Sequence, residues 1–325
     1  MNLTPVDRLE ILILVDNATD MLSSTPSHVE SEAAGLMRRG IRMLAGKCLC
    51  CAAHGLSCLI TVHHGTASHT VLFDTGPEEY SFERNVTRLG ADLGSVESII
   101  LSHGHWDHAG AMLLALGMIR NRNGGRKIPY YAHPGMFHSR AVRMPNGVLR
   151  LMEDIPSVED LTAFGAEVIV TTEPQVMHDS MFFVSGEIPR VTSYERGFPG
   201  QVRLMEDGKN WEADELLLDE RFLAVNVAGK GLVVLSACSH AGVVNVLMHA
   251  RDRFSGVPLH AVMGGLHLSG PNEAVISQTV EGLRSFDLKT IAAGHCTGWR
   301  ALTALATAFG DKILAPTAVG KRYVF

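Results

Sequence analysis

Short runs of β-branched and apolar residues recur along the chain and predict buried strands. They are found at Leu9–Val15, Leu56–Val62, Thr70–Phe73, Ser98–Leu101, Val168–Val170, Met181–Val184, Phe222–Val227, Leu232–Leu235 and Ala261–Met263. Stretches with apolar residues three or four positions apart predict helices at Ala109–Arg122, Gly242–Arg253, Glu273–Phe286 and Arg300–Phe309. The order of these elements predicts an α/β (α+β) protein in which helices cover two sheets.

Glycine and proline breakers concentrate in the middle of the chain, and proline recurs there from Pro129 to Pro199. No repeat at a fixed period divides the sequence. We therefore predict one domain over residues 1–325, with a loop-rich insertion around 120–215 that shapes a pocket.

The composition predicts a globular protein that acts on a small molecule. Hydrophobic residues make up 46% of the chain and charged residues 19%, which is enough apolar surface for a large core. The net charge of −6 is scattered, with no basic block that would predict nucleic-acid binding. The run Ala109–Ile119 is shorter than the roughly 18 apolar residues that span a bilayer. We expect a cytoplasmic location without membrane association. The sequence leaves open whether the protein forms a homodimer.

The sharpest chemical signal is the HxHxDH motif formed by His103, His105, Asp107 and His108. It follows an apolar strand and precedes a predicted helix. Residues two apart on an extended loop point the same way, so His103 and His105 can bind one ion. Asp107 and His108 can then face a second ion roughly 3.5–4 Å away. We predict a site for two divalent metal ions, with zinc favoured over manganese or iron.

Two metals need more ligands than this motif supplies, and further candidates stand at the ends of other predicted strands. His240, His267 and His295 each follow an apolar run in the C-terminal half. Asp74 ends the run before Thr75 and Gly76, where its carboxylate can orient a ligand histidine by hydrogen bonding. All four are predicted to reach one sheet edge.

The motif, the aspartate turn before it and the histidines after it resemble the metallo-β-lactamase superfamily. This resemblance implies a four-layer αββα sandwich with a dinuclear metal site at one edge of the sheets. Other segments resemble the branch labelled 7,8-dihydropterin-6-yl-methyl-4-(β-D-ribofuranosyl)aminobenzene-5′-phosphate synthase. These segments are Leu14–Asn17, His54–Ser57, Ser185–Arg190, Cys238–Gly242, Gly264–His267 and Gly294–Gly298.

The chain departs from the superfamily pattern in two places. It has no Thr-Pro-Gly-His stretch for the usual third histidine and no strand-end Gly-Asp for the usual bridging aspartate. Which of His240, His267 and His295 binds which ion therefore stays open, and Cys238 is an alternative thiolate ligand.

The leading functional hypothesis is metal-assisted hydrolysis by a metal-bound hydroxide, because neutral imidazoles leave zinc acidic enough to lower the pKa of water to about 7. Asp107 and His267 are the catalytic candidates. Arg190 is the candidate clamp for a phosphate or carboxylate on a small ester, phosphodiester or lactone.

Three other functions remain open from the sequence. They are the condensation that the branch label describes, an iron-dependent redox reaction, and a non-catalytic binding module. Carboxylate ligands suit iron better than three imidazoles do.

Overall fold

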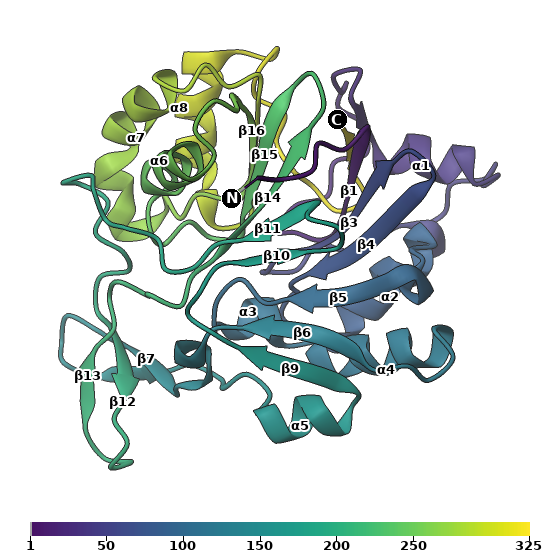
Figure 1. The fold of residues 1–325 in the computed structure, drawn as a ribbon. Helices are drawn as coiled ribbons and strands as arrows, with labels where there is room; N and C mark the ends of the chain where they lie inside the picture. Colours follow the sequence, from purple (N-terminus) through teal and green to yellow (C-terminus); the bar gives the residue numbers. More distant parts are fainter. Residues whose placement is uncertain (1) are drawn as a thin grey trace.

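The computed structural model describes residues 2–325, in which two large β-sheets pack face to face (Figure 1). The core between them is made of side chains from both inner faces, among them Ile11, Ile60, Phe73, Val233 and Met263. Each of these side chains is almost completely buried. This inner layer holds the two halves of the molecule together.

The first sheet has eight strands, and its middle strands lead toward the HxHxDH loop. β1, β3 and β4 pair antiparallel, whereas β4, β5, β6 and β9 pair parallel. In spatial order the strands are β2 (Val29–Glu30), β18 (Arg322–Val324), β1 (Arg8–Val15), β3 (Ser57–His64), β4 (Ala67–Phe73), β5 (Val96–Ile100), β6 (Ile128–Ala132) and β9 (Ala166–Val170).

The second sheet has six strands, and its last three are parallel. In spatial order they are β10 (Gln175–Met177), β11 (Phe182–Val184), β14 (Phe222–Val227), β15 (Gly231–Ser236), β16 (Leu259–Gly265) and β17 (Thr290–Gly294). Because parallel strands present their carboxyl ends at the same edge, β15, β16 and β17 deliver the residues that follow them to one place.

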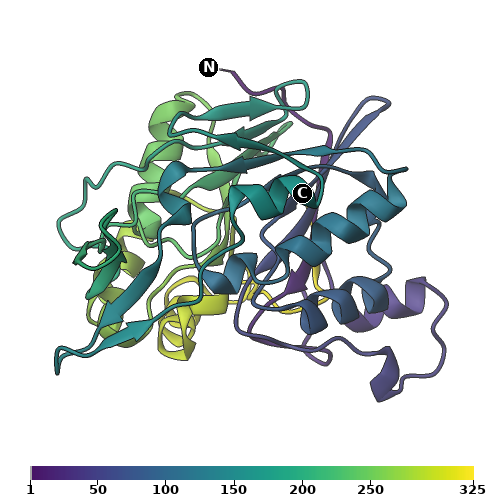
Figure 2. The same cartoon turned by 90° about the horizontal axis from the view of Figure 1, so that it is seen from below.

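Helices cover the outer face of each sheet (Figures 1 and 2). On the first sheet the apolar sides of α2, α3, α4 and α5 pack on side chains such as Leu72 and Ile99. On the second, α6, α7 and α8 pack on side chains such as Val234 and Ile291. The four-layer αββα sandwich is therefore confirmed. The helices are α1 (Glu32–Arg38), α2 (Glu79–Leu89), α3 (Trp106–Ala109), α4 (Met112–Arg122), α5 (Val158–Ala163), α6 (Val243–Arg253), α7 (Ile276–Arg284) and α8 (Trp299–Phe309).

A small third sheet projects from the sandwich beside the edge where the site lies (Figure 1). The expected loop-rich insertion is more regular than predicted, because β6, β9, β10 and β11 from the same segment belong to the two large sheets. The added part is this four-stranded sheet of β13 (Trp211–Ala213), β12 (Gln201–Leu204), β7 (Arg140–Arg143) and β8 (Leu149–Leu151).

The sequence analysis missed several elements, among them α2 and β6, and joined α3 and α4. Helix α2 is mostly polar and buries only one side, including Phe82 and Val86. Strand β6 contains Pro129, which we interpreted as a breaker. The helix predicted from Ala109 is interrupted: α3 ends at Ala109 and α4 begins at Met112. Gly110 lies between them against the Pro77 carbonyl, where a Cβ would not fit. Across residues 2–325, none of the helices combines the length and apolarity that crossing a membrane requires.

Candidate metal centre

The predicted site residues meet at the carboxyl-terminal edge of the parallel strands. Asp74 follows β4 and the HxHxDH loop follows β5. His240, His267 and His295 come after β15, β16 and β17. Two sheets that are far apart in sequence therefore supply one cluster of imidazoles, as the strand-end positions predict.

A first donor group consists of His103, His105 and His240. The Nε2 atom of His103 lies 3.1 Å from Nδ1 of His105. The His240 ring is centred 4.9 Å from the His103 ring and 5.1 Å from the His105 ring. One nitrogen of each residue lies within 4.8 Å of the others, and all three residues are buried.

A second donor group consists of Asp107, His108 and His295. The Oδ2 atom of Asp107 lies 3.7 Å from Nε2 of His108 and 3.5 Å from Nε2 of His295. His54 approaches the same carboxylate oxygen from the cavity, at 3.5 Å. The group thus combines a carboxylate with two imidazoles.

Hydrogen bonds outside the cluster orient three of these rings. The outward nitrogen of His105 lies 2.9 Å from Oε1 of Gln201, and that of His295 lies 2.9 Å from Oδ1 of Asn17. The Nδ1 atom of His108 lies 2.7 Å from Oδ2 of Asp74. Because each partner is an oxygen acceptor, the outward nitrogen carries a proton, and in the neutral ring the lone pair lies on the inward nitrogen.

The fourth ring, His103, is oriented through a hydrogen-bond relay in which the Ser102 hydroxyl connects it to Asp74. The Ser102 hydroxyl donates to Oδ2 of Asp74 at 2.7 Å, so its oxygen accepts from Nδ1 of His103 at 2.9 Å. The Nε2 lone pair of His103 then faces the Nδ1 lone pair of His105. Two lone pairs 3.1 Å apart repel each other unless a cation lies against both.

His240 gives a second sign that the cluster fits a metal ion. Both of its ring nitrogens are buried, and neither has a hydrogen-bond partner among the described residues. A buried polar atom without a partner costs free energy, which a metal–nitrogen bond would remove. The residues present therefore fit divalent metal ions.

The electrostatics of the two donor groups differ. Burial lowers the pKa of His105 to about 4, and burial with the neighbouring imidazoles lowers the pKa of His103 and His240. These rings are neutral at pH 7 and can act as ligands. In the second group burial disfavours charge on His108, but the carboxylates of Asp107 and Asp74 outweigh it and raise its pKa to about 9. The second group thus attracts positive charge.

The loop between the two HxH histidines is clamped on both sides. The amide of Gly104 donates to Oδ2 of Asp219 at 2.9 Å, and its carbonyl accepts from Nη1 of Arg140 at 2.9 Å. Arg140 and Asp219 also pair with each other at 2.8 Å, and both are buried. The clamp fixes the peptide that separates His103 from His105.

Backbone strain collects at the same edge. Asp74, Ser239, His267 and His295 all have positive φ, between 42° and 59°. Left-handed conformations of residues other than glycine cost about 1–3 kcal/mol each and persist where the surrounding structure enforces them. At this edge they turn the chain so that side chains at the strand ends face the cluster.

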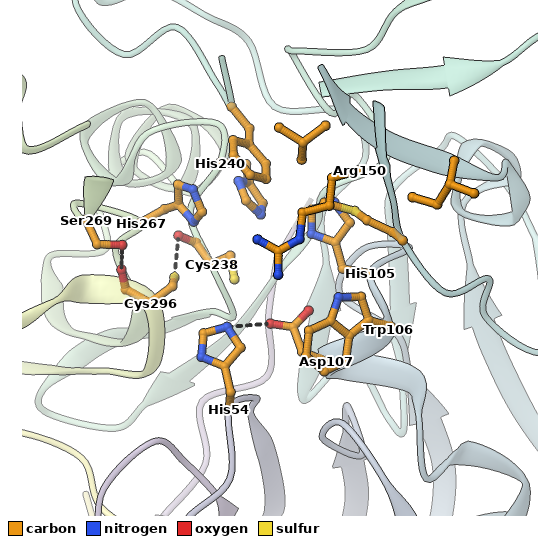
Figure 3. A pocket seen from close by; sticks show the side chains of 14 residues that line it. His54, His105, Trp106, Asp107, Arg150, Cys238, His240, His267, Ser269 and Cys296 are labelled. Atoms are coloured by element: carbon orange, nitrogen blue, oxygen red, sulfur yellow. Dashed lines mark hydrogen bonds and ion pairs between the residues drawn. The ribbon is translucent and has the colours of Figure 1, made fainter. Parts of the chain in front are cut away.

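A cavity of about 300 Å³ opens onto both donor groups. Its walls combine the edge that carries the donor groups with side chains from the small third sheet, including Val142 and Leu151. Figure 3 shows the Arg150 guanidinium reaching from this sheet toward Asp107 and His105. Trp106 and Phe198 add aromatic surface.

The structure corrects the choice of anion clamp. Arg190 does not line this cavity, and its guanidinium donates to the carbonyls of Ile188 and Leu216. The arginine that lines the cavity is Arg150. His267 does line it, with its ring centred 4.2 Å from the ring of His240.

The sequence analysis did not single out three residues of the site. Gln201 and Arg150 lie in the segment interpreted as an insertion, and Asn17 lies after β1. Asn17 belongs to one of the segments that carried the family resemblance, which is the signal that could have singled it out.

The comparisons with known proteins agree with this arrangement. The sequence model of the metallo-beta-lactamase superfamily matches residues 55–191. The chain is 31% identical over 252 residues to the 7,8-dihydropterin-6-methyl-4-(beta-D-ribofuranosyl)-aminobenzene-5'-phosphate synthase of Methanocaldococcus jannaschii. This match covers 76% of the chain and 82% of the relative. The chain belongs to the metallo-β-lactamase superfamily. The predicted resemblance to the synthase branch is confirmed by the same relative.

Solved structures of the superfamily share the fold. One is described as a metal-dependent hydrolase of the beta-lactamase superfamily; it has a TM-score of 0.70 and 20% identity, and the match covers 97% of this chain and 98% of that one. Another is the metallo-beta-lactamase fold protein YhfI from Bacillus subtilis, with a TM-score of 0.51 and 11% identity, covering 98% of this chain and all of that one. At these identities the likeness concerns the fold alone.

Proposed function

We propose that this member of the metallo-β-lactamase superfamily is a metal-dependent hydrolase of a small anionic ester, phosphodiester or lactone. The observation that carries the proposal is the set of inward-facing ring nitrogens of His103, His105, His108 and His295, each ring being oriented by a hydrogen bond on its other nitrogen. Such an array is suited to two divalent ions, and imidazole-rich ligands favour zinc.

The two donor groups would each hold one ion. Bound divalent ions supply Lewis acidity, which lowers the pKa of a water molecule and polarises a substrate oxygen. His103, His105 and His240 would hold one ion, and Asp107, His108 and His295 the other.

Asp107 and His267 are the residues suited to move protons. Burial raises the pKa of Asp107, but the imidazoles of His108 and His295 outweigh burial and hold it below its ordinary value. Asp107 is therefore ionised at neutral pH and can orient an attacking water. Burial lowers the pKa of His267, but its interaction with Cys296 outweighs burial and raises it. His267 lies on the cavity wall, where its protonated form could donate to a leaving oxygen.

The cavity supports an anionic substrate of modest size. Arg150 presents a guanidinium that can bind a phosphate or carboxylate with two parallel hydrogen bonds. Trp106 and Phe198 offer flat apolar surface for the remainder of the molecule. A volume of about 300 Å³ is in the range of cavities that hold small molecules.

The proposal is tested by elemental analysis of the purified protein together with hydrolysis of a phosphodiester and a lactone before and after chelation. We expect close to two zinc or manganese ions per chain, and turnover that chelation abolishes and added metal restores. His240→Gln should lose one ion and most of the activity. The control His249→Gln, on helix α6 outside the cavity, should keep both. Metal-free protein with full activity would overturn the proposal.

Condensation is the second candidate, because the Methanocaldococcus jannaschii relative, which is 31% identical, is named a synthase. The same donor groups and Arg150 could hold a phosphorylated partner while its leaving group departs. Mass spectrometry of the products from a dihydropterin and a ribofuranosyl-aminobenzene phosphate separates the two reactions. A joined product would favour condensation, whereas products that have gained only water would favour hydrolysis.

A further inference from the structure

The sulfur of Cys238 lies at the centre of the metal-binding edge. It belongs to three overlapping sets of donor atoms, and within each set all atoms lie within 4.8 Å of one another. These sets are His103, His108 and Cys238; Cys238, His240 and His267; and Cys238, His295 and Cys296.

These sets place the sulfur between the two donor groups. His103 and His240 belong to the first group, whereas His108 and His295 belong to the second. The Sγ atom lies 3.3 Å from Nε2 of His108, the inward-facing nitrogen of that ring. Figure 3 shows the sulfur pointing into the space between His240 and Asp107.

A ligand at this position would complete both groups. Each group supplies three donors, and zinc in proteins takes four or five ligands. Among the described residues that line the cavity, Asp107 is the only carboxylate, and it already faces His108 and His295. The chain therefore provides no second carboxylate there to join the two ions.

Packing alone does not explain this cysteine. Free cysteine often fills a core as a small apolar residue, and Cys58 does so in β3 between the two sheets. Cys238 is just as buried, but its sulfur meets a histidine nitrogen instead of a hydrocarbon surface. It also stands two residues after β15, in the turn that carries His240.

We propose that Cys238 is a sulfur ligand of this metal centre, placed where its thiolate would be within reach of the ions that both donor groups would hold. This inference rests on the metal centre in the proposed function. On metal binding the S–H bond breaks, the sulfur lone pairs bind the ions and the proton passes to solvent, so no oxidant or reductant is needed. Thiolate favours zinc and cobalt over manganese and magnesium.

Cobalt substitution tests this ligand by spectroscopy. We expect cobalt(II)-loaded protein to show a near-ultraviolet sulfur-to-cobalt charge-transfer band in addition to visible bands. Cys238→Ser should lose the ultraviolet band, keep visible bands from the histidine ligands and bind cobalt at least tenfold more weakly. The controls Cys296→Ser, at the neighbouring sulfur, and Cys58→Ser, in the core, should keep the band.

Several outcomes would overturn the inference. They are a fully loaded wild-type protein without the band, a band that survives in Cys238→Ser, and a band that disappears in Cys296→Ser alone. If Cys238→Ser does not fold, the wild-type and Cys296→Ser spectra still decide, because only a sulfur outside position 296 can produce a band in both. A band without hydrolysis would reject the proposed activity and keep this ligand, whereas hydrolysis without a band would do the reverse.

Discussion

Replacing Asp74 by asparagine tests whether hydrogen bonds outside the cluster determine metal affinity. The carboxylate accepts from the Ser102 amide at 2.8 Å and the Ser102 hydroxyl at 2.7 Å, and Nδ1 of His108 lies 2.7 Å from it. Asparagine has the same shape and tolerates the left-handed backbone at this position, where φ is 59°. The substitution therefore changes the hydrogen bonding while the fold is retained.

The amide group reverses the direction of the relay. If the asparagine oxygen keeps the bond from the Ser102 amide, its NH₂ group faces His108 and the Ser102 hydroxyl. His108 must then accept on Nδ1 and carry its proton on Nε2, and Ser102 donates to His103 with the same result. Both inward lone pairs are lost.

The expected loss follows from known replacements of such partners, which reduce metal affinity about 10–100-fold. This corresponds to roughly 1.4–2.8 kcal/mol for each ion. Because the relay reaches both donor groups, we expect both ions to bind more weakly in Asp74→Asn.

Competition with a chelator of known affinity measures this effect, and thermal unfolding reports whether the fold survives. Asp92→Asn is the matched control, because Asp92 is an exposed helix cap that accepts from the Gly94 amide far from any site residue. Unchanged affinity of Asp74→Asn for both ions would refute the tautomer argument. If Asp74→Asn bound only one of the two ions more weakly, the hydrogen-bond relay would control the metal affinity of one donor group and not of both.

Three further outcomes follow from the structure. Arg150→Met should lower kcat/KM for an anionic ester about 10–100-fold, since one charged hydrogen-bonding pair is lost, and leave kcat/KM for a neutral ester unchanged. The control Arg143→Met, on the same small sheet but outside the cavity lining, should leave kcat/KM for both esters unchanged in the same steady-state assay. The pKa of His108 is raised to about 9, so below that pH an ion in the second group must displace one more proton than an ion in the first group, whose imidazole pKa values are lowered. In calorimetric titrations from pH 7 to 9, the affinity of the second group should therefore rise more steeply than that of the first, and equal slopes would contradict this reasoning. Gly110→Ala should lower the free energy of unfolding, measured in urea, by about 3 kcal/mol, because a Cβ would lie 1.8 Å from the Pro77 carbonyl oxygen. The control Gly117→Ala, in open space on helix α4, should raise the free energy of unfolding by up to about 1 kcal/mol.

The sequence alone determined which histidine and aspartate side chains gather at the carboxyl-terminal edge of the strands. The HxHxDH motif lies within residues 103 to 108, so its side chains stay close to one another wherever this loop lies in the fold. The histidines at 240, 267 and 295 follow apolar runs, and parallel strands must bring their carboxyl ends to one edge. The two-sheet sandwich also followed from the order of strands and helices, because each apolar face must pack against another element.

Tertiary structure decided which residues complete the site. His105 meets Gln201 across 96 positions, and His295 meets Asn17 across 278. No periodicity in the sequence reports such distances, because they depend on how the sheets pack. For the same reason, the sequence pointed to Arg190 as the anion clamp, whereas Arg150 is the arginine that lines the cavity. Both arginines lie in irregular sequence, and only the placement of the small third sheet over the cavity brings one of them to the edge that carries the donor groups.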